Sequence, residues 1–316
     1  MGDSLAQQYK ECCAEQSARV LAPILSELER VDRNEVHALH EVKLAGNTPE
    51  MFGERAGAVE AAAVASLLCK RKDVELLDLS YNKVDDEGAE SLSVMLRENS
   101  SLKELNLCGN QIGPGGCAAL CAALSSEGGG GGGILFMDLS CNPLEDDGGR
   151  AVAEMLECND TLQLLNLSDT ELSMRALVSI VAALGSPKAT LKSIALENAR
   201  VRRHDDVAQH FAAALARNTT LLHLRMGKLS IDDSGLSTLV DYGLVRNETL
   251  TVLDLRCNGL TSACAPALER LLTHCPSLEE LCLSNNRLGD GGAAAIAAGL
   301  HHNTNLSWLE LCNNSE

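Results

Sequence analysis

The sequence has few aromatic residues and few basic residues, and both shortages restrict what the protein can be. Only 2% of the 316 residues are aromatic although 45% are hydrophobic, so the core has to be built from Leu, Ala, Val and Ile. Such a core suits many small, similar layers. The 26 Lys and Arg face 44 Asp and Glu, a net charge of −18. A nucleic-acid binder needs clustered basic residues, so we expect no nucleic acid among the partners and consider basic protein surfaces more natural ones.

Three further features are missing. No two of the 13 cysteines form a CxxC pair, and the first residues, MGDSLAQQYKECC, lack the apolar stretch of a secretory signal. We therefore expect reduced thiols and a cytoplasmic protein. No apolar run approaches the roughly 20 residues that a membrane-spanning helix needs, so we expect no membrane partner.

A repeated motif, LxxLxLxxN with conservative substitutions, occurs ten times along the chain. Apart from the first and third gaps, the copies are spaced by 28 to 30 residues, a period typical of a repeat protein. The first positions of the copies are Leu39, Val74, Leu102, Ile134, Leu162, Leu191, Leu221, Leu250, Leu278 and Leu306.

Each repeat predicts one strand and one helix. Leu77, Asp78 and Leu79 alternate with the period of two that a strand has. Residues 85–96 change to a helical period, with Ala89, Leu92, Val94 and Leu96 on the predicted buried face. Strands lie about 4.8 Å apart and helices need roughly 10 Å, so stacked repeats must curve. We predict an α/β leucine-rich-repeat solenoid, a horseshoe with a parallel concave sheet and convex helices.

Asparagine recurs at two places in the repeat. The Asn that closes the motif is expected to turn into the core and satisfy buried backbone groups; it occurs at Asn47, Asn82, Asn110, Asn142, Asn258, Asn286 and Asn314. Thr170, Ala199 and Leu229 replace it in the three central repeats. A second Asn is expected to end the helix in a left-handed conformation, at Asn99, Asn159, Asn218, Asn247 and Asn303.

The motifs LELLDLSYNKVDDEGAESL, LKELNLCGNQIGPGGCAAL and LEELCLSNNRLGDGGAAAI resemble the ribonuclease-inhibitor-like leucine-rich-repeat family. The resemblance covers roughly residues 36–316. It implies a protein-binding scaffold or adaptor without enzymatic activity, such as a subunit of a larger intracellular assembly with a cytoskeletal, axonemal or ciliary setting. Relatives of this kind also leave two alternatives: a GTPase-activating protein of the Ran type, with a small GTPase as partner, or an inhibitor that engulfs a basic enzyme.

The ends of the chain and one insertion depart from the repeat. Residues 1–35 predict a helical cap on the repeat domain, residues 36–316, with a docking helix as the alternative. Residues 125–133, SSEGGGGGG, predict a flexible surface loop and lack the lysine of a phosphate-binding loop. The last repeat ends after its strand motif. The predicted edge strand would contain Leu306, Trp308, Leu309 and Leu311. It is either an interaction surface or a short ending.

The predicted binding site lies on the concave face, where residues flanking the inward leucines point outward. The candidate residues are Tyr81, Phe136, His223, Arg225, Lys228, Arg256, Glu280, Trp308 and Glu310. Aromatic rings beside charges are favoured in binding hot spots. Arg225, Lys228 and Arg256 form a basic island that Arg200, Arg202 and Arg203 could extend. Either acids such as Asp254 and Asp232 neutralise this island, or it docks an acidic peptide, a tubulin-like tail or a GTPase surface.

We predict no catalytic, cofactor or metal site. His204, His210, His223 and His274 lie in different contexts, without a Cys or Ser placed by a recognisable motif. Acidic clusters such as Asp85 to Glu87 and Asp232 to Asp233 lack the spacing of a calcium loop. They stand where the repeat helices begin, and we expect them to cap helix N-termini.

Overall fold

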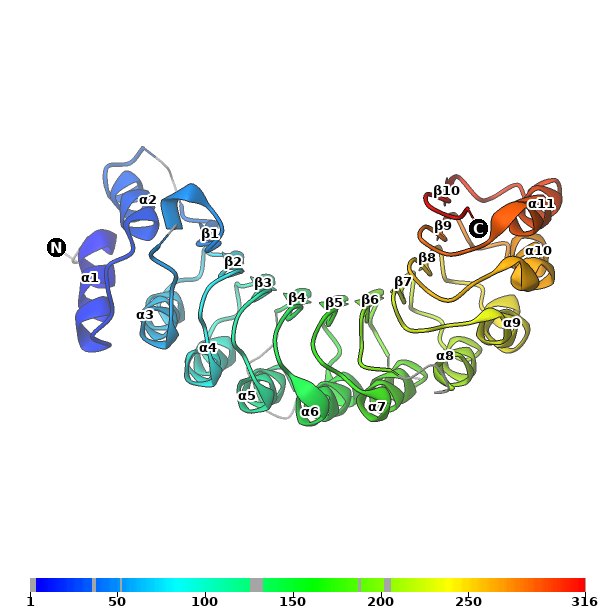
Figure 1. Cartoon of the computed structure of the whole chain (residues 1–316). Coiled ribbons are helices and arrows are strands. Elements are labelled where there is room, and N and C mark those ends of the chain that lie inside the picture. The colour runs from blue at the N-terminus through cyan, green and yellow to red at the C-terminus, as the bar shows by residue number, and fades with distance from the viewer. Residues whose placement is uncertain are drawn as a thin grey trace. The chain divides into compact units, whose positions relative to one another are not determined.

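A computed structural model describes residues 4–35, 38–51, 53–125, 133–186, 189–201 and 206–315 of the chain. The chain divides into two compact units, Met1–Leu162 (unit 1) and Gln163–Glu316 (unit 2). Within each unit short strands alternate with helices, and the strands line one side of a curved stack while the helices line the other (Figure 1). This is the α/β repeat arrangement that the sequence predicts.

Unit 1 begins with two helices and continues with four strands in parallel register, β1 to β4. Its elements are α1 (Leu5–Glu15), α2 (Ala22–Asp32), β1 (Glu41–Lys43), η1 (Pro49–Met51), α3 (Ala58–Cys69), β2 (Leu76–Asp78), α4 (Asp86–Glu98), β3 (Glu104–Asn106), α5 (Pro114–Leu124), β4 (Phe136–Asp138) and α6 (Glu145–Cys158).

Unit 2 contains strands β5 to β10, again parallel and paired in chain order. Its elements are β5 (Leu164–Asn166), α7 (Met174–Leu184), β6 (Ser193–Ala195), α8 (Val207–Leu215), β7 (His223–Arg225), α9 (Asp233–Tyr242), η3 (Leu244–Arg246), β8 (Val252–Asp254), η4 (Ser262–Cys264), α10 (Ala265–His274), β9 (Glu280–Cys282), α11 (Gly289–Leu300) and β10 (Trp308–Glu310).

The core of each repeat lies between its strand and its helix. Leu77 and Leu79 are fully buried, as the alternation predicts. On α4, Leu92 and Leu96 are buried, but Val94 is 50% exposed, and Met95 is buried instead. The prediction for Val94 was wrong because a residue two positions after Leu92 lies on the opposite side of a helix with 3.6 residues per turn. Each buried leucine stabilises the fold by about 1.5–3 kcal/mol.

The asparagines that close the motif bond neighbouring repeats together, as predicted. Asn110 donates from Nδ2 to the carbonyls of Leu79 and Leu107, both at 2.9 Å, and its Oδ1 accepts from the Val84 N–H at 3.0 Å. One side chain thus satisfies backbone groups of two repeats. Asn47 does not follow this pattern and is exposed. After Asn47 the chain continues into η1. The N–H that donates to Oδ1 of Asn82 therefore comes from Ala56, just before α3.

The asparagines at the helix ends do not adopt the left-handed conformation that the sequence suggested. Asn99, Asn159 and Asn247 have φ between −94° and −79° and an extended backbone. Their side chains act instead. Asn99 donates to the carbonyl of Leu68 at 2.8 Å and accepts from the Leu102 N–H at 2.9 Å. The side-chain amide therefore replaces the left-handed turn as the device that ends the helix.

In the repeats, left-handed residues follow the strands instead, whereas Ser17 and Asn34 are left-handed after the N-terminal helices α1 and α2. Values of φ between 54° and 58° occur at Tyr81, Cys141, Asp169, Lys228 and Asn285. In each of these repeats the position is the one directly before the Asn of the motif or its replacement. The sharp turn that leads from the strand toward the helix side therefore recurs with the repeat.

The N-terminal helices are bonded to each other and to the first repeat. Asp32 accepts from the N–H groups of Leu5 and Ala6 at 2.8 and 3.0 Å, which caps α1. Glu60 on α3 accepts from the Gly57 N–H at 2.8 Å and from Nε of Arg19 at 3.0 Å. Burial raises the pKa of Glu60, but these hydrogen bonds outweigh it and lower the pKa below its usual value.

Two further sequence expectations concern parts of the chain outside the repeats' strands and helices. Residues 126–132, most of the predicted glycine-rich loop, lie outside the described residues. In the described part of the chain, no helix combines the length and the apolar composition that crossing a membrane requires.

Candidate protein-binding surface

Strand register brings most of the predicted binding residues together in unit 2. His223, Glu280 and Trp308 lie in one row across β7, β9 and β10, with Val252 between the first two. The next row contains Arg225, Asp254, Cys282 and Glu310. We call these two rows, together with Glu197, Lys228 and Arg256, the unit 2 strand face.

Tyr81 and Phe136 belong to unit 1. Tyr81 is 43% exposed, and its ring lies over Gly109, where a Cβ atom would come within 2.8 Å of Tyr81 Cδ1. Phe136 is half-buried in β4, beside Glu104 of β3 in the strand register. Glycine at position 109 therefore makes room for the Tyr81 ring.

Arg256 is neutralised by Asp254, as one of the two sequence interpretations held. Its Nη2 and Nε atoms lie 2.6 and 2.7 Å from Oδ2 of Asp254, whose side chain is 3% exposed. Burial lowers the pKa of Arg256, but Asp254 outweighs burial and raises it. Asp232 takes no part in this, because it caps α9 by accepting from the Gly235 N–H at 2.9 Å.

Glu197 joins Arg256 and Asp254 across a glycine, a contact that was not predicted from the sequence. Oε1 of Glu197 lies 4.0 Å from Nε of Arg256, two repeats away. A Cβ atom on Gly227 would come within 2.7 Å of that oxygen and 3.0 Å of Cγ of Arg256. The usable signal was a glycine between two opposite charges at equivalent positions of successive repeats. Burial and the nearby Asp254 raise the pKa of the Glu197 carboxyl.

Arg225 and Lys228 remain as exposed cations. Among the described residues, neither forms an ion pair, although Arg225 is near enough to Glu197 to lower its pKa. Arg200, proposed as an extension of the basic island, pairs with Glu171 at 2.7 Å. Arg202 and Arg203 lie outside the described residues. The island therefore consists of Arg225 and Lys228 beside a neutralised Arg256.

The Cys282 thiol of the unit 2 strand face is a poor nucleophile. Burial raises the pKa of Cys282 to about 11, and its Sγ donates to Oε2 of Glu310 at 3.3 Å. None of the 13 cysteines, all of which the structure describes, is in a disulfide. In the described ranges, no three His, Cys, Asp or Glu side chains are grouped so as to hold a metal ion. What this face offers is charge and aromatic surface.

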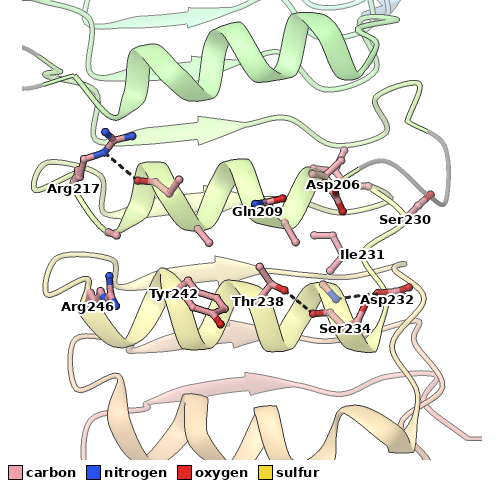
Figure 2. A pocket seen from close by; sticks show the side chains of 17 residues that line it. Asp206, Gln209, Arg217, Ser230, Ile231, Asp232, Ser234, Thr238, Tyr242 and Arg246 are labelled. Atoms are coloured by element: carbon pink, nitrogen blue, oxygen red, sulfur yellow. Dashed lines mark hydrogen bonds between the residues drawn. The ribbon is translucent and has the colours of Figure 1, made fainter.

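A groove of about 960 Å³ lies on the helix side of unit 2, between α8 and α9 (Figure 2). Asp206 and Asp232 stand at one end of it, and Arg217 and Arg246 at the other. Acids at helix N-termini and bases at helix C-termini complement the helix dipoles, and Arg217 donates to the Ala213 carbonyl at 3.2 Å. These charges therefore have a structural explanation.

Comparison with known proteins identifies the repeat. A family model described as Leucine Rich repeat matches residues 73–93, 98–121, 137–153, 246–263 and 274–297. The ribonuclease inhibitor of Sus scrofa is 27% identical over 263 residues, which cover 83% of this chain and 55% of that protein. The chain belongs to the ribonuclease-inhibitor-like leucine-rich-repeat family.

Other relatives of this leucine-rich-repeat protein are much longer. The NACHT, LRR and PYD domains-containing protein 3 of Bos taurus is 31% identical over 220 residues, covering 69% of this chain and 21% of that protein. Protein CARMIL of Dictyostelium discoideum is 27% identical over 257 residues, covering 79% of this chain and 24% of that protein. The chain thus spans between about a fifth and about half of these relatives.

Proposed function

We propose that this leucine-rich-repeat protein is a non-enzymatic scaffold or adaptor that binds other proteins through the unit 2 strand face. The observation that carries the proposal is that Arg225 and Lys228 are exposed, without an ion pair in the described residues, on the face that also presents His223 and Trp308. Arginine and tryptophan are enriched in binding hot spots. The partner surface would be an acidic segment, such as an acidic peptide, a tubulin-like tail or a GTPase surface.

The proposal includes the remaining expectations from the sequence. Residues 1–35 would serve as a cap on a repeat domain formed by residues 36–316, and the protein would be a subunit of a larger cytoplasmic assembly. A cytoskeletal or ciliary setting is the one we favour. The strand edge at β10 would contribute to binding together with Trp308, which is 62% exposed.

The test is quantitative mass spectrometry of proteins that co-purify with the tagged chain from native cells. The Arg225→Glu, Trp308→Ala double variant is expected to lose specific partners. Its control is Arg175→Glu, Tyr242→Ala on the helix side of unit 2, which makes the same charge change and removes a ring that is also 62% exposed. Loss of the same partners from both variants, or from neither, would rule out the unit 2 strand face.

A second function is favoured by the net charge of −18 and by the similarity to ribonuclease inhibitor. The acidic protein would then engulf a basic enzyme and inhibit it. This predicts binding that weakens steeply between about 0.05 and 0.2 M salt, because the attraction is between opposite net charges. The Ran-type GTPase-activating alternative predicts faster single-turnover GTP hydrolysis by a bound small GTPase.

A further inference from the structure

The strand β1 of unit 1 has backbone groups that its neighbour does not use. In this parallel sheet alternate residues bond to each side. The N–H of Leu44, just after β1, donates to the carbonyl of Asp78 at 2.8 Å. The carbonyl of His40, just before β1, accepts from the N–H of Leu76 at 3.2 Å. The even-numbered positions along β1 therefore face β2. Glu41 and Lys43 must therefore direct their N–H and C=O groups to the opposite side.

No described residue bonds to these groups. The helix α2 stands beside β1 (Figure 1) and contributes no hydrogen bond to the backbone of Glu41 or Lys43 within the described ranges. Between them lies a groove of about 730 Å³, whose apolar lining includes Pro23, Ile24 and Val31. An open strand edge thus borders an apolar groove.

The charged side chains in the lining of this groove are mainly acidic. It carries the carboxylates of Glu27, Glu41 and Glu50 against the single ammonium of Lys43. Lys43 pairs with Glu41, and Glu27 pairs with Arg30 at 2.8 Å. Glu50 forms no ion pair with any residue in the described part of the chain. The surplus negative charge favours an occupant that carries Lys or Arg.

We propose that the groove binds an extended segment of a partner protein, which pairs with β1 as an added strand. Its alternate apolar side chains would enter the groove beside Pro23, Ile24 and Val31, and its intervening Lys or Arg side chains would lie beside Glu41. A helix would satisfy its own backbone groups and leave those of Glu41 and Lys43 without partners. Strand addition is an established way for proteins to hold peptides. This surface lies in unit 1 and is independent of the unit 2 strand face.

The first measurement uses two fluorescein-labelled, blocked heptapeptides, one of alternating valine and lysine and one of alternating valine and glutamate. Fluorescence anisotropy with the full chain is expected to show binding of the lysine peptide at least about tenfold tighter than that of the glutamate peptide. Glu41→Lys should reduce or reverse this preference. Equal binding of both peptides, or binding of neither, overturns the proposal.

Two variants of one residue test the backbone pairing. Lys43→Pro removes the outward N–H, whereas Lys43→Ala keeps it, and both remove the ammonium. Proline is tolerated on the open side of an edge strand, and the Lys43 N–H takes no part in pairing with β2. The proline variant should bind the lysine peptide about tenfold more weakly than the alanine variant, which corresponds to one lost hydrogen bond. Equal affinities overturn the proposal.

Hydrogen exchange provides a readout that does not depend on a variant. The amides of Glu41 and Lys43 should exchange quickly in the free protein and slowly with the lysine peptide bound. The Leu44 amide, already bonded to Asp78, should be protected in both states. Peptide binding without protection at Glu41 and Lys43 would show that the occupant does not pair with β1 and would overturn the proposal. A chain that dimerises through this edge in gel filtration, and then excludes the peptide, would also overturn it.

Discussion

The left-handed turn that follows the strands after β1 is occupied by residues of very different suitability. Asn198, Asn285 and Asn313 adopt it at φ of 55° to 59°, and asparagine visits this region readily. Lys228 and Tyr81 adopt it at φ of 54° and 58°, although a side chain without a short polar group is disfavoured there by roughly 1–2 kcal/mol. Lys228 also belongs to the unit 2 strand face, so backbone strain and proposed function coincide at that position.

Two substitutions of Lys228 separate the effect of backbone strain on stability from the effect of charge. We expect Lys228→Asn to raise the free energy of unfolding in urea by about 1 kcal/mol, because asparagine relieves the backbone strain. Lys228→Ala removes the same ammonium without relieving the strain, so it should leave stability close to that of the wild type. Equal stabilisation by both variants would attribute the effect to charge rather than to conformation.

Glu197 should make stability depend on pH. Burial and Asp254 raise the pKa of its carboxyl in the folded protein, so the folded state holds the proton more tightly than the unfolded state. The stability from this group is fully present below the unfolded pKa of about 4.3 and is lost as the pH rises through the folded value. Glu197→Gln should therefore be more stable than the wild type at pH 7, by less than about 1 kcal/mol. The difference should vanish below about pH 4.

Urea unfolding at pH 4 and pH 7 measures this difference. Glu248→Gln, at an exposed position between repeats, is the matched control and should show no such pH-dependent gain. A Glu197→Gln protein that is less stable than the wild type at pH 7 would show that the contact with Arg256 outweighs burial.

The alternation of residues was enough to predict the rows of the unit 2 strand face. A period of two and parallel register place His223, Glu280 and Trp308 in one row. It was not enough to predict the cluster around Arg256. That cluster depends on which way flexible charged side chains turn, and on the space that Gly227 leaves between Glu197 and Arg256. The repeat places Glu197, Gly227 and Arg256 at equivalent positions, but it does not say which way the two charged side chains turn.

At the scale of elements, strands and helices were predictable and their ends were not. The helix α4 lies close to its predicted range, whereas the sequence misjudged how it ends at Asn99. Both a left-handed backbone and a side-chain hydrogen bond can close a helix with asparagine. Only the position of the preceding helix, whose Leu68 carbonyl accepts from Asn99, decides between them. The acidic pairs at the helix starts were correctly expected to cap helices. In each pair, however, the second residue bonds to the backbone before the next helix.

Asp85 and Asp86 divide this capping between two helices. Asp85 accepts from Gly88 at 3.2 Å at the start of its own helix, and Asp86 accepts from the Gly113 N–H at 2.6 Å, just before α5. Asp86→Ala should lower the free energy of unfolding by about 1 kcal/mol, the usual value of a helix cap. Hydrogen exchange should become faster at the start of α5.

Asp85→Ala is the control for this prediction. It should lower stability by a similar amount but speed exchange at the start of α4. Faster exchange in α4 alone with both variants would mean that Asp86 does not cap across repeats. Asp232 and Asp233 repeat the arrangement, since Asp233 accepts from the Thr261 N–H at 2.7 Å.

At the scale of the whole molecule, the net charge of −18 should oppose compaction. Salt screens repulsion between exposed charges over about 10 Å at 0.1 M. We therefore expect the melting temperature at pH 7 to rise between about 0.05 and 0.5 M sodium chloride. Differential scanning calorimetry measures this directly. A falling melting temperature would mean that surface ion pairs such as Arg270 with Asp241, 2.8 Å apart, outweigh the repulsion.

The asparagines that close the motif define where the chain can be cut and rejoined. Asn110 bonds to a carbonyl of its own repeat and to the equivalent one in the repeat before, and Asn142 does the same with Leu139 and Leu107. Removing residues 83–110 would place Asn142 opposite Leu79, an equivalent carbonyl. A protein built this way can be shortened or lengthened by whole repeats. Recombination can therefore change the number of strands in the sheet without redesign of the core.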